Sequence, residues 1–334
     1  MDADQNPIKR ILAKRGMGQV FTVTFGLILL CIVFSFLNPT FLSGRNLSNL
    51  SRQIVPILLV GISQSYILIT GNIDLSIGSV LGMSCMMSAT LMTKGVHPIG
   101  AMAITMAACL MVGLLNGILV AKCKLPPFIA TLGTMTIGRG IAQIVNGNYN
   151  TDSIGEGAQY FRDFFYYAKL MGIYYPVWIA AVLWIVFNFI LSKTRTGRHV
   201  YAIGSNREAA LLSGVSVAKT TCIAYLISAF CSCIVGFMTT ATTGMGAMDA
   251  GNMYEMYAVA ASVIGGVSTL GGQGILLGTI IGAAIWGVLQ NGLQFAGAPV
   301  AIRNIVIGVI VVVSVLLDIV IRSGRFSRKP VSDS

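Results

Sequence analysis

The chain has 334 residues, of which 55% are hydrophobic and only 10% are charged, whereas soluble domains carry about 25% charged residues. Twenty-two basic and 11 acidic side chains are too few to cover the surface of a soluble globule of this size. Composition therefore excludes an ordinary soluble enzyme, a disordered chain and a nucleic-acid-binding protein, although the net charge is +11. In a membrane protein, such an excess of cations instead indicates on which side of the bilayer each loop lies.

Ten apolar stretches follow one another along the chain, each close to the roughly 20 residues that a helix needs to cross the hydrocarbon layer. The third and the eighth are interrupted by glycine and polar residues. The first is too long for the apolar region of a secretory signal peptide, and no cleavage site follows it. The pattern predicts an all-α fold, a polytopic transmembrane helix bundle of about ten spans. The stretches are residues 19–37, 53–70, 75–93, 98–121, 126–147, 174–192, 218–241, 254–270, 274–296 and 300–321.

The distribution of lysine and arginine predicts which loops face the cytoplasm. With ten spans, 15 of the 22 basic residues lie on the side of the two chain ends, six lie on the other side, and Arg139 lies within the fifth span. Basic residues are enriched in cytoplasmic loops, so the N- and C-termini are both expected in the cytoplasm. The chain then consists of a cytoplasmic N-terminal segment (1–18), a transmembrane domain (19–321) and a cytoplasmic C-terminal tail (322–334).

The long loop on the outer side, residues 148–173, is rich in aromatic side chains. The spacing of Tyr160, Phe164 and Tyr167 predicts an amphipathic helix that lies along the outer membrane interface. Aromatic residues of this kind commonly anchor a protein at the lipid headgroups. A docking surface for an external partner is the second interpretation, and the two are compatible.

The loop of residues 193–217, on the cytoplasmic side, contains the signals of a short helix. Ser205 and Glu208 have the spacing of a capping box and Gly214 is suited to end a helix, so about two helical turns are expected over 205–213. A helix this short is unstable in water by itself. It either packs against a cytoplasmic partner, which we favour, or belongs to a solvated linker. The residues expected at the contact are Ser205, Asn206, Glu208, Ala209, Ala210 and Gly214.

Motifs for catalysis and for metal binding are absent from the sequence. No lysine follows a glycine, so there is no G-x-x-x-x-G-K-[ST] loop to hold the phosphates of ATP. His97 and His199 are far apart and no C-x-x-C pair occurs. The seven cysteines are interpreted as small apolar side chains. The chain is therefore not expected to be an enzyme, or to hold a metal or a cofactor of its own.

A carboxylate stands at the break between the second and third apolar stretches. Asp74 either caps the third span, where a negative charge suits the positive helix N-terminus, or contacts the substrate and controls its passage. A carboxylate near a membrane span is costly and is usually paired or functional. Asn72 and Ser76 beside it can satisfy the backbone groups that the break frees.

A second pair of charges suggests a contact between distant spans. Arg139 in the fifth span either extends to the outer interface or pairs with a carboxylate, for which Glu255 is the candidate. Glu255 stands at the start of the eighth stretch, so capping of that helix is its alternative role.

Four amide side chains lie in otherwise apolar stretches. They are candidates for a polar path through the membrane, and hydrogen bonds between helices are an equally good explanation. They are Gln64, Gln290, Asn291 and Gln294.

Glycines at intervals of four residues predict close helix packing. They are Gly78 and Gly82 in the third stretch and Gly274, Gly278 and Gly282 in the ninth. The Gly-containing segments 71–82 and 265–282 hint at an internal repeat, but the offsets of the following residues disagree, so no repeat is predicted.

Four ordered segments of the chain resemble one family of membrane proteins. Together they are similar to the permease subunits of bacterial sugar ABC importers of the ribose/galactose/xylose type, the inner-membrane components of binding-protein-dependent transport systems, and the resemblance covers residues 20–321. Many members have a second glycine at the position of Asn72 and Thr-Ser around Val267. The segments are ITGNIDLSIG (69–78), KLPPFIATLG (124–133), GRHVYAIGSN (197–206, continuing to Ser213–Gly214) and YEMYAVAASVIGG (254–266) with GGQG (271–274).

This resemblance implies a multi-pass subunit of the bacterial inner membrane that moves a monosaccharide, such as a pentose, a hexose or a related polyol, by alternating access. Two copies of the chain, or one copy and a related permease, would enclose the path. A separate ATP-binding cassette subunit would hydrolyse ATP with Mg²⁺ and act on the helix at 205–213. A soluble sugar-binding protein outside would deliver the substrate.

Two other functions stay open at this point. A nucleoside or amino-acid ABC importer would use a related permease. A secondary transporter would need carboxylates in the middle of its spans for the coupling ion, but Asp74 lies at a break and Asp318 near the cytoplasmic end of the last span.

Overall fold

The computed structural model describes residues 17–322. The segments 1–18 and 322–334, which the sequence predicts to be cytoplasmic, therefore lie almost entirely outside the described residues. Within residues 17–322 the regular elements are helices, apart from one two-stranded antiparallel hairpin in which Lys169 pairs with Tyr174. The elements are α2 (Met17–Leu37), α3 (Gly44–Ile69), α4 (Ile77–Thr93), α5 (Pro98–Ala121), α6 (Pro127–Ile144), η1 (Glu156–Ala158), α7 (Gln159–Arg162), η2 (Asp163–Tyr167), β1 (Lys169–Leu170), β2 (Ile173–Tyr174), α8 (Tyr175–Lys193), α9 (Arg195–Ser205), α10 (Arg207–Leu212), α11 (Val217–Thr243), α12 (Tyr254–Ile264), α13 (Leu276–Phe295) and α14 (Val300–Arg322).

The all-α fold is confirmed, and each of the ten apolar stretches contains one helix, but not every helix has the length of a membrane span. In the described part of the chain, six helices are long and apolar enough to cross a membrane: α2, α3, α5, α8, α11 and α13. The prediction of a full span is wrong for 254–270, because α12 has only 11 residues and is about 16 Å long, about half of the hydrocarbon thickness. The third stretch is also short, since α4 has 17 residues.

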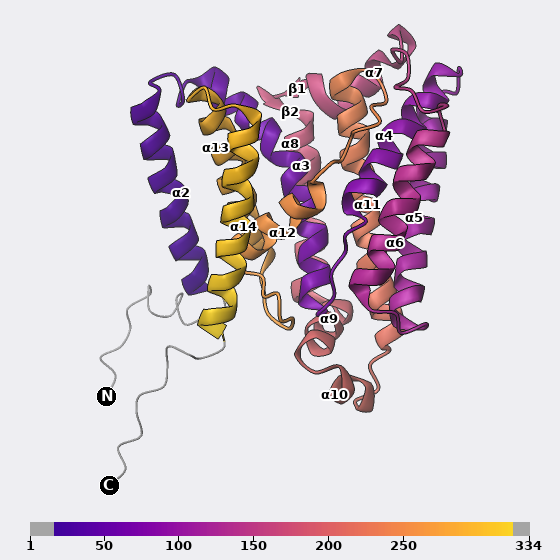
Figure 1. Ribbon diagram of the computed structural model, residues 1–334, viewed down its shortest axis with the longest axis vertical. Helices are drawn as coiled ribbons and strands as arrows, with labels where there is room; N and C mark the ends of the chain where they lie inside the picture. Colours follow the sequence, from indigo (N-terminus) through magenta and orange to yellow (C-terminus); the bar gives the residue numbers. More distant parts are fainter. Residues whose placement is uncertain (1–16, 323–334) are drawn as a thin grey trace.

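The two short helices follow two breaks that run in opposite directions (Figure 1). Residues 70–76 climb without regular helical structure from the lower end of α3 to the start of α4. Residues 244–253 descend from the upper end of α11 to the start of α12. Gly71 and Gly244 begin the two breaks with φ angles of 74° and 72°, which glycine adopts without strain. Irregular backbone at this depth is tolerated where protein surrounds it.

The interior is built around α3 and α11, which lie between the other helices (Figure 1). In the most apolar segment of each helix, 78% of the residues of α3 and 72% of those of α11 are buried, whereas the buried share is 11% in α2 and 22% in α8. Helix α2 exposes Phe25 and Phe36 (69% and 86%). In a bundle whose composition belongs to a membrane, these outer surfaces are the ones suited to lipid.

Glycine allows the closest approaches, as predicted for four of the five positions. Gly278 and Gly282 of α13 lie against the backbone carbonyls of Gly265 and Ala261. Gly78 and Gly82 lie against the carbonyls of Gly251 and Ala250, so their partner is the descending segment 244–253 rather than a second helix. The prediction for Gly274 as part of a helix face is wrong, because α13 begins at Leu276 and Gly274 has a φ of 149° in the preceding loop.

Both described ends of the chain lie at one end of the bundle. The start of α2 and the end of α14 point to the same side as α9 and α10 (Figure 1). We call this side the α10 end, and the side that carries α7, η2 and the hairpin the η2 end. An even number of crossings agrees with this arrangement.

Candidate functional site

The first polar cluster surrounds Asp74 inside the protein. One carboxylate oxygen accepts hydrogen bonds from the backbone N–H (2.8 Å) and the hydroxyl (2.6 Å) of Ser76, and the other accepts from the hydroxyl of Ser228 (2.6 Å). Asp74 is 2% exposed. Asp74 is not the N-cap of α4 as predicted, because Ser76 occupies the cap position without a side-chain cap bond, and Asp74 binds the turn before the helix.

This cluster extends into two further helices. The Asn116 side-chain amide of α5 donates to the Ser76 hydroxyl (2.9 Å), and Thr134 of α6 donates to the Asn116 carbonyl oxygen (2.7 Å). The Tyr225 hydroxyl of α11 donates to the backbone carbonyl of Ile73 (3.0 Å). Buried networks of this kind hold a segment firmly when each member is satisfied. The 70–76 break is therefore tied to α5, α6 and α11.

Asn72 and Gln64 differ in their surroundings. Asn72 is buried and its amide donates to the Thr70 hydroxyl (2.8 Å), a side-chain group rather than one of the backbone groups that it was expected to satisfy. Gln64 of α3 is fully buried, and neither its amide nitrogen nor its carbonyl oxygen has a hydrogen-bond partner.

Arg139 holds the second break. Its guanidinium donates to the carbonyls of Ala250 (2.6 Å) and Gly251 (2.9 Å). The interpretation that Arg139 extends to the interface is therefore wrong, because the side chain is bound within the protein. Glu255 lies nearby in the first turn of α12, and one of its carboxylate oxygens is buried without a hydrogen bond. Arg139 and Glu255 face the same Gly78.

The amides of α13 lie toward the η2 end. Asn291 and Asn46 of α3 exchange two amide hydrogen bonds (2.9 and 3.2 Å), and Asn291 also donates to Gln53 (3.3 Å). The interhelical explanation thus holds for Asn291. Gln290 is half-buried. Gln294 lines a cavity of about 560 Å³, whose lining residues are Thr40, Ser43, Arg45, Asn46, Asn49, Gln53, Asn291, Gln294 and Phe295.

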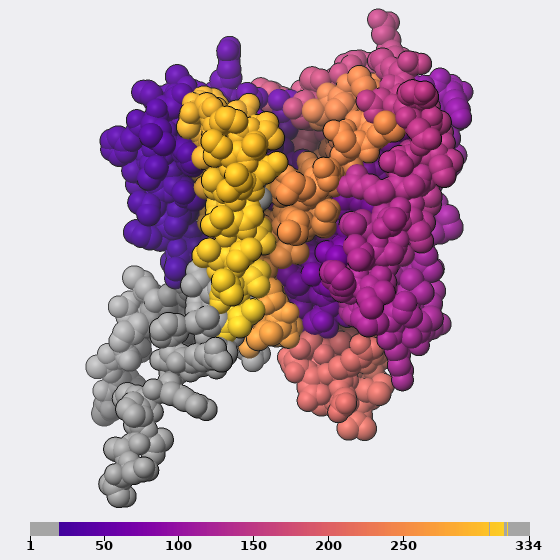
Figure 2. All heavy atoms as spheres, viewed as in Figure 1, coloured from indigo at the N-terminus to yellow at the C-terminus, as the bar shows by residue number. Residues whose placement is uncertain are grey.

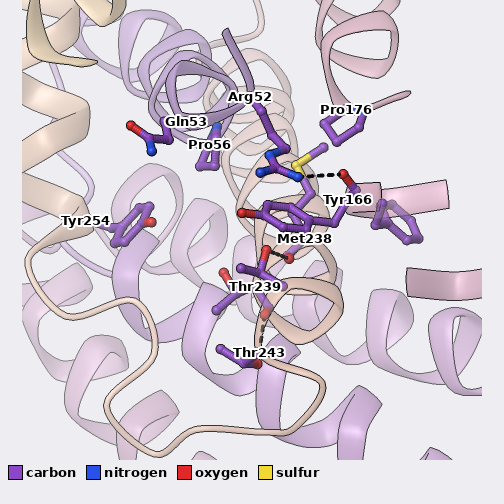
Figure 3. A pocket seen from close by; sticks show the side chains of 11 residues that line it. Arg52, Gln53, Pro56, Tyr166, Pro176, Met238, Thr239, Thr243 and Tyr254 are labelled. Carbon is purple, nitrogen blue, oxygen red and sulfur yellow. Dashed lines mark hydrogen bonds between the residues drawn. The ribbon is translucent and has the colours of Figure 1, made fainter. Parts of the chain in front are cut away.

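A second cavity, of about 230 Å³, lies between α3, η2, α8, α11 and α12, and we call it the η2-end pocket (Figure 3). It combines aromatic rings, one guanidinium, one amide and three threonines. Sequence reasoning missed this site, because its residues come from five elements that share no sequence pattern. The lining residues are Arg52, Gln53, Pro56, Phe165, Tyr166, Pro176, Met238, Thr239, Thr242, Thr243 and Tyr254.

The aromatic loop forms one wall of this pocket. Tyr160, Phe164 and Tyr167 are 45%, 49% and 42% exposed, while Phe161 and Phe165 are buried against Phe237 of α11. The predicted amphipathic helix is confirmed only in part, since the segment is divided into the short turns η1, α7 and η2.

At the opposite end, α9 and α10 form a small helical element. Its own core consists of Ile203, Ala210 and Val217. The predicted capping box is wrong: Ser205 is the last residue of α9, and the side chain of Asn206 caps α10 by accepting from the backbone N–H of Ala209 (2.9 Å). Gly214 follows α10 with a φ of 80°, as expected for a helix end.

The exposed surface of this element is both apolar and basic. Leu211 and Leu212 are 63% and 90% exposed. Of the expected contact residues Ser205, Asn206, Glu208, Ala209 and Gly214 are exposed, whereas Ala210 is buried and faces the core of the element. Exposed basic side chains surround the two leucines in sequence: Lys193, Arg195, Arg198, Arg207 and Lys219.

Backbone contacts at Gly204 join α9 to both of the Gly-containing loops at this end. A Cβ at Gly204 would collide with the carbonyl of Ile69 and would lie 2.5 Å from the backbone nitrogen of Gly272. The Gly272 N–H in turn donates to the Ile69 carbonyl (2.9 Å). Gly71 lies beside Gly271. We call this set of contacts the Gly204 joint.

The Tyr201 hydroxyl supports the joint by donating to the Gly274 carbonyl (2.6 Å). Burial raises the pKa of this hydroxyl above its ordinary value, so the proton needed for the hydrogen bond stays in place at neutral pH.

Comparison with known proteins gives a family match over most of the chain. Residues 46–315 match the family described as branched-chain amino acid transport system / permease component. The ribose import permease of Bacillus subtilis is 36% identical over 304 residues, covering 91% of this chain and 94% of that protein. The D-allose transport system permease of Escherichia coli is 33% identical over 88% of this chain and 90% of that protein. A galactose/methyl galactoside import permease of Haemophilus influenzae is 32% identical over 89% of this chain and 93% of its own length.

No solved structure matches the chain.

Proposed function

Because this chain belongs to the family of branched-chain amino acid transport system permease components, we propose that it is the membrane subunit of an ABC importer for a monosaccharide. It is a multi-pass transport subunit and not an enzyme. The choice of a sugar is supported by the relatives named as ribose, allose and galactose permeases, whose similarity extends over about nine-tenths of the chain. An amino-acid substrate, which the family description suggests, is the second candidate.

The α10 end faces the cytoplasm in this proposal, and the η2 end faces the periplasm of a bacterial inner membrane. The excess of basic residues in the loops at the α10 end supports this orientation. Two copies of the chain, or this chain and a related permease, would enclose the path for the sugar. A soluble sugar-binding protein would dock at the η2 end.

The observation that carries the proposal is the exposed surface of α10 and its attachment to the interior. A separate ATPase subunit, using ATP and Mg²⁺, would bind Leu211 and Leu212 in an apolar groove. The basic side chains around these leucines suit an acidic rim on that groove. An isolated helix of six residues is unstable in water, which also favours a partner.

The Gly204 joint would transmit the movement. At this joint α9 contacts the end of α3 and the loop before α13 without side chains between the backbones. A displacement of α9 and α10 by the ATPase would therefore move the 70–76 break directly, because close-packed contacts offer little compliance. From there the hydrogen bonds of Asp74 lead to α4 and α11.

The test reconstitutes the permease in proteoliposomes with its ATPase subunit and, in parallel preparations, a ribose-, allose-, galactose- or leucine-binding protein, and follows the uptake of labelled D-ribose, D-allose, D-galactose and L-leucine. We expect accumulation of one or more of the sugars only with ATP inside and binding protein outside. Uptake that continues without the ATPase subunit would show a secondary transporter. Uptake of leucine alone would assign the amino-acid function.

A further inference from the structure

We propose that the η2-end pocket is a binding site for one monosaccharide within the permease itself, occupied after the sugar leaves its binding protein. This inference rests on the proposed function, since that function supplies the substrate class. The pocket of about 230 Å³ corresponds to the share of liquid volume of about eight water molecules. It suits a single small molecule rather than a peptide.

The walls of the pocket offer flat apolar surfaces. The Tyr166 ring lies under the Arg52 guanidinium, and Tyr254 stands on the other side of the pocket (Figure 3). Phe165 adds a third ring. The C–H faces of a sugar ring are apolar and pack against aromatic rings, whereas its hydroxyl groups require polar partners. Mostly apolar walls with a few polar groups are typical of small-molecule sites.

The polar groups supply both donors and acceptors. The Nε of Arg52 is buried and has no hydrogen-bond partner, although the other guanidinium nitrogens reach the Tyr166 carbonyl and Asn49 (both 3.4 Å). Each of these two terminal nitrogens makes only one long hydrogen bond, so each keeps a further N–H that a ligand hydroxyl in the pocket can accept.

The threonines provide the acceptors. The hydroxyls of Thr239 and Thr242 donate to the carbonyls of Val235 (2.9 Å) and Met238 (2.7 Å) in their own helix. Each hydroxyl oxygen keeps acceptor capacity after donating its proton. A sugar hydroxyl is at once a donor and an acceptor, so it can bind a threonine oxygen and a terminal nitrogen of Arg52 together.

The charge of the η2-end pocket comes from one side chain. The residues that line the η2-end pocket include no carboxylate, and Arg52 is their one basic side chain. The guanidinium already lies 3.8 Å from the centre of the Tyr166 ring and 4.2 Å from that of Tyr174. Both rings satisfy part of its charge. The rings do not neutralise the guanidinium, so the choice of a neutral monosaccharide over an anion rests on the substrate class of the proposed function, and ribose 5-phosphate is the competing ligand in the test.

The position of the pocket connects it to the breaks. Tyr254 is the first residue of α12 and follows the 244–253 segment that Arg139 holds. The larger cavity at the η2 end, which is lined by several amides, shares Gln53 with the pocket. A sugar in the pocket would thus contact the short helix at which the second break ends.

Ligand-observed saturation-transfer NMR on the purified full-length permease, without binding protein, tests the site with D-ribose, D-allose and D-galactose. We expect a signal at millimolar concentrations that falls at least fivefold in Thr239→Val and in Arg52→Gln. The matched control is Thr136→Val, because this exposed threonine of α6 also bonds only to its own helix (Leu132, 3.1 Å). Size-exclusion profiles identify variants that fail to fold. If Arg52→Gln does not fold, the test rests on Thr239→Val, which keeps the shape of the side chain.

The outcomes separate this site from the proposed function. Three results would overturn the monosaccharide site. They are the absence of any sugar signal with the wild-type permease, signals from both pocket variants that equal the wild-type signal, and a signal from ribose 5-phosphate alone. ATPase stimulation by the loaded binding protein, measured in the whole importer, should persist in Thr239→Val. Loss of ATP-driven sugar uptake by the wild type would instead contradict the proposed function, whatever the NMR result.

Discussion

Gly78 of α4 and Gly251 of the descending segment contact each other reciprocally: the carbonyl of each residue occupies the space that a Cβ on the other would need. The two breaks therefore meet where their short helices begin. Arg139 fixes this meeting point by donating to Gly251 and its neighbour Ala250. Half-helices that start within the membrane and meet near its middle are the arrangement in which many transporters form their central sites.

Gly78→Ala is expected to lower the apparent melting temperature of the detergent-purified protein strongly. The new methyl group would collide with the backbone carbonyl of Gly251 and the carboxylate of Glu255, and a backbone atom cannot move aside as the end of a flexible side chain can. Overpacking of a dense interior costs about 1–3 kcal/mol. The matched control is Gly133→Ala, whose Cβ would meet no atom within 4 Å. Equal melting temperatures of the two variants would contradict the close contact. Fluorescence-detected size-exclusion chromatography after heating gives the measurement.

Gly204→Ala is expected to uncouple sugar uptake from ATP hydrolysis, since a methyl group would force α9 away from Ile69 and Gly272. Tyr201→Phe removes only the hydrogen bond to Gly274 and should uncouple more weakly. The ratio of sugar molecules imported to ATP hydrolysed, in proteoliposomes with the ATPase subunit co-purified in normal amount, is the readout. A general loss of stability would lower both rates together. An unchanged ratio in both variants would exclude transmission through the Gly204 joint.

The corrected cap of α10 makes a prediction that differs from the capping-box interpretation. Asn206→Ala should destabilise α10 by about 1 kcal/mol, because Asn206 accepts from the N–H of Ala209, whereas Ser205→Ala should have little effect on the cap. Co-purification of the ATPase subunit with each variant measures the consequence. The observed cap would be contradicted by stronger loss of the ATPase in Ser205→Ala than in Asn206→Ala.

Asp74→Asn should destabilise the protein less than Asp74→Ala. Asparagine keeps an acceptor for Ser76 but cannot accept from Ser228 through its amide nitrogen, whereas alanine leaves all three donors without their acceptor. Each unpaired buried polar group costs about 1–3 kcal/mol. Melting temperatures are compared with that of Asp152→Ala, a change at an exposed carboxylate. If both Asp74 variants melt like the wild type, the cluster does not hold the break.

Labelling with an impermeant thiol reagent tests the orientation. In a cysteine-free background we expect Gln159→Cys to react in intact cells and Ser205→Cys to react only after the membrane is opened. Both positions are exposed on the protein, and the helices that contain them, α7 and α9, lie at opposite ends of the bundle (Figure 1 and, by colour, Figure 2). Reaction of Ser205→Cys in intact cells would reverse the assignment of the α10 end to the cytoplasm.

Local signals in the sequence determined the helical class, the positions of the helices and several of their ends. Apolar length alone places a helix in each of the ten stretches, and Gly214 ends α10 as its type suggests. The sequence predicted Ser205 as the capping residue, which was wrong, because Ser205 and Asn206 are adjacent and both residue types cap helices. Packing of Gly204 against Ile69 and Gly272 keeps Ser205 in α9, so the tertiary contact selects Asn206.

Only the tertiary structure decided which distant residues share a site. Arg139 and Gly251 are far apart in the chain, as are Arg52, Tyr166 and Thr239 of the η2-end pocket. Helical periodicity states which face of a helix is apolar, but it contains no information about which neighbour covers that face. The sequence predicted the break at Asp74. It predicted neither the break at 244–253 nor the opposite directions of the two, because direction through the bundle depends on how α3 and α11 pack.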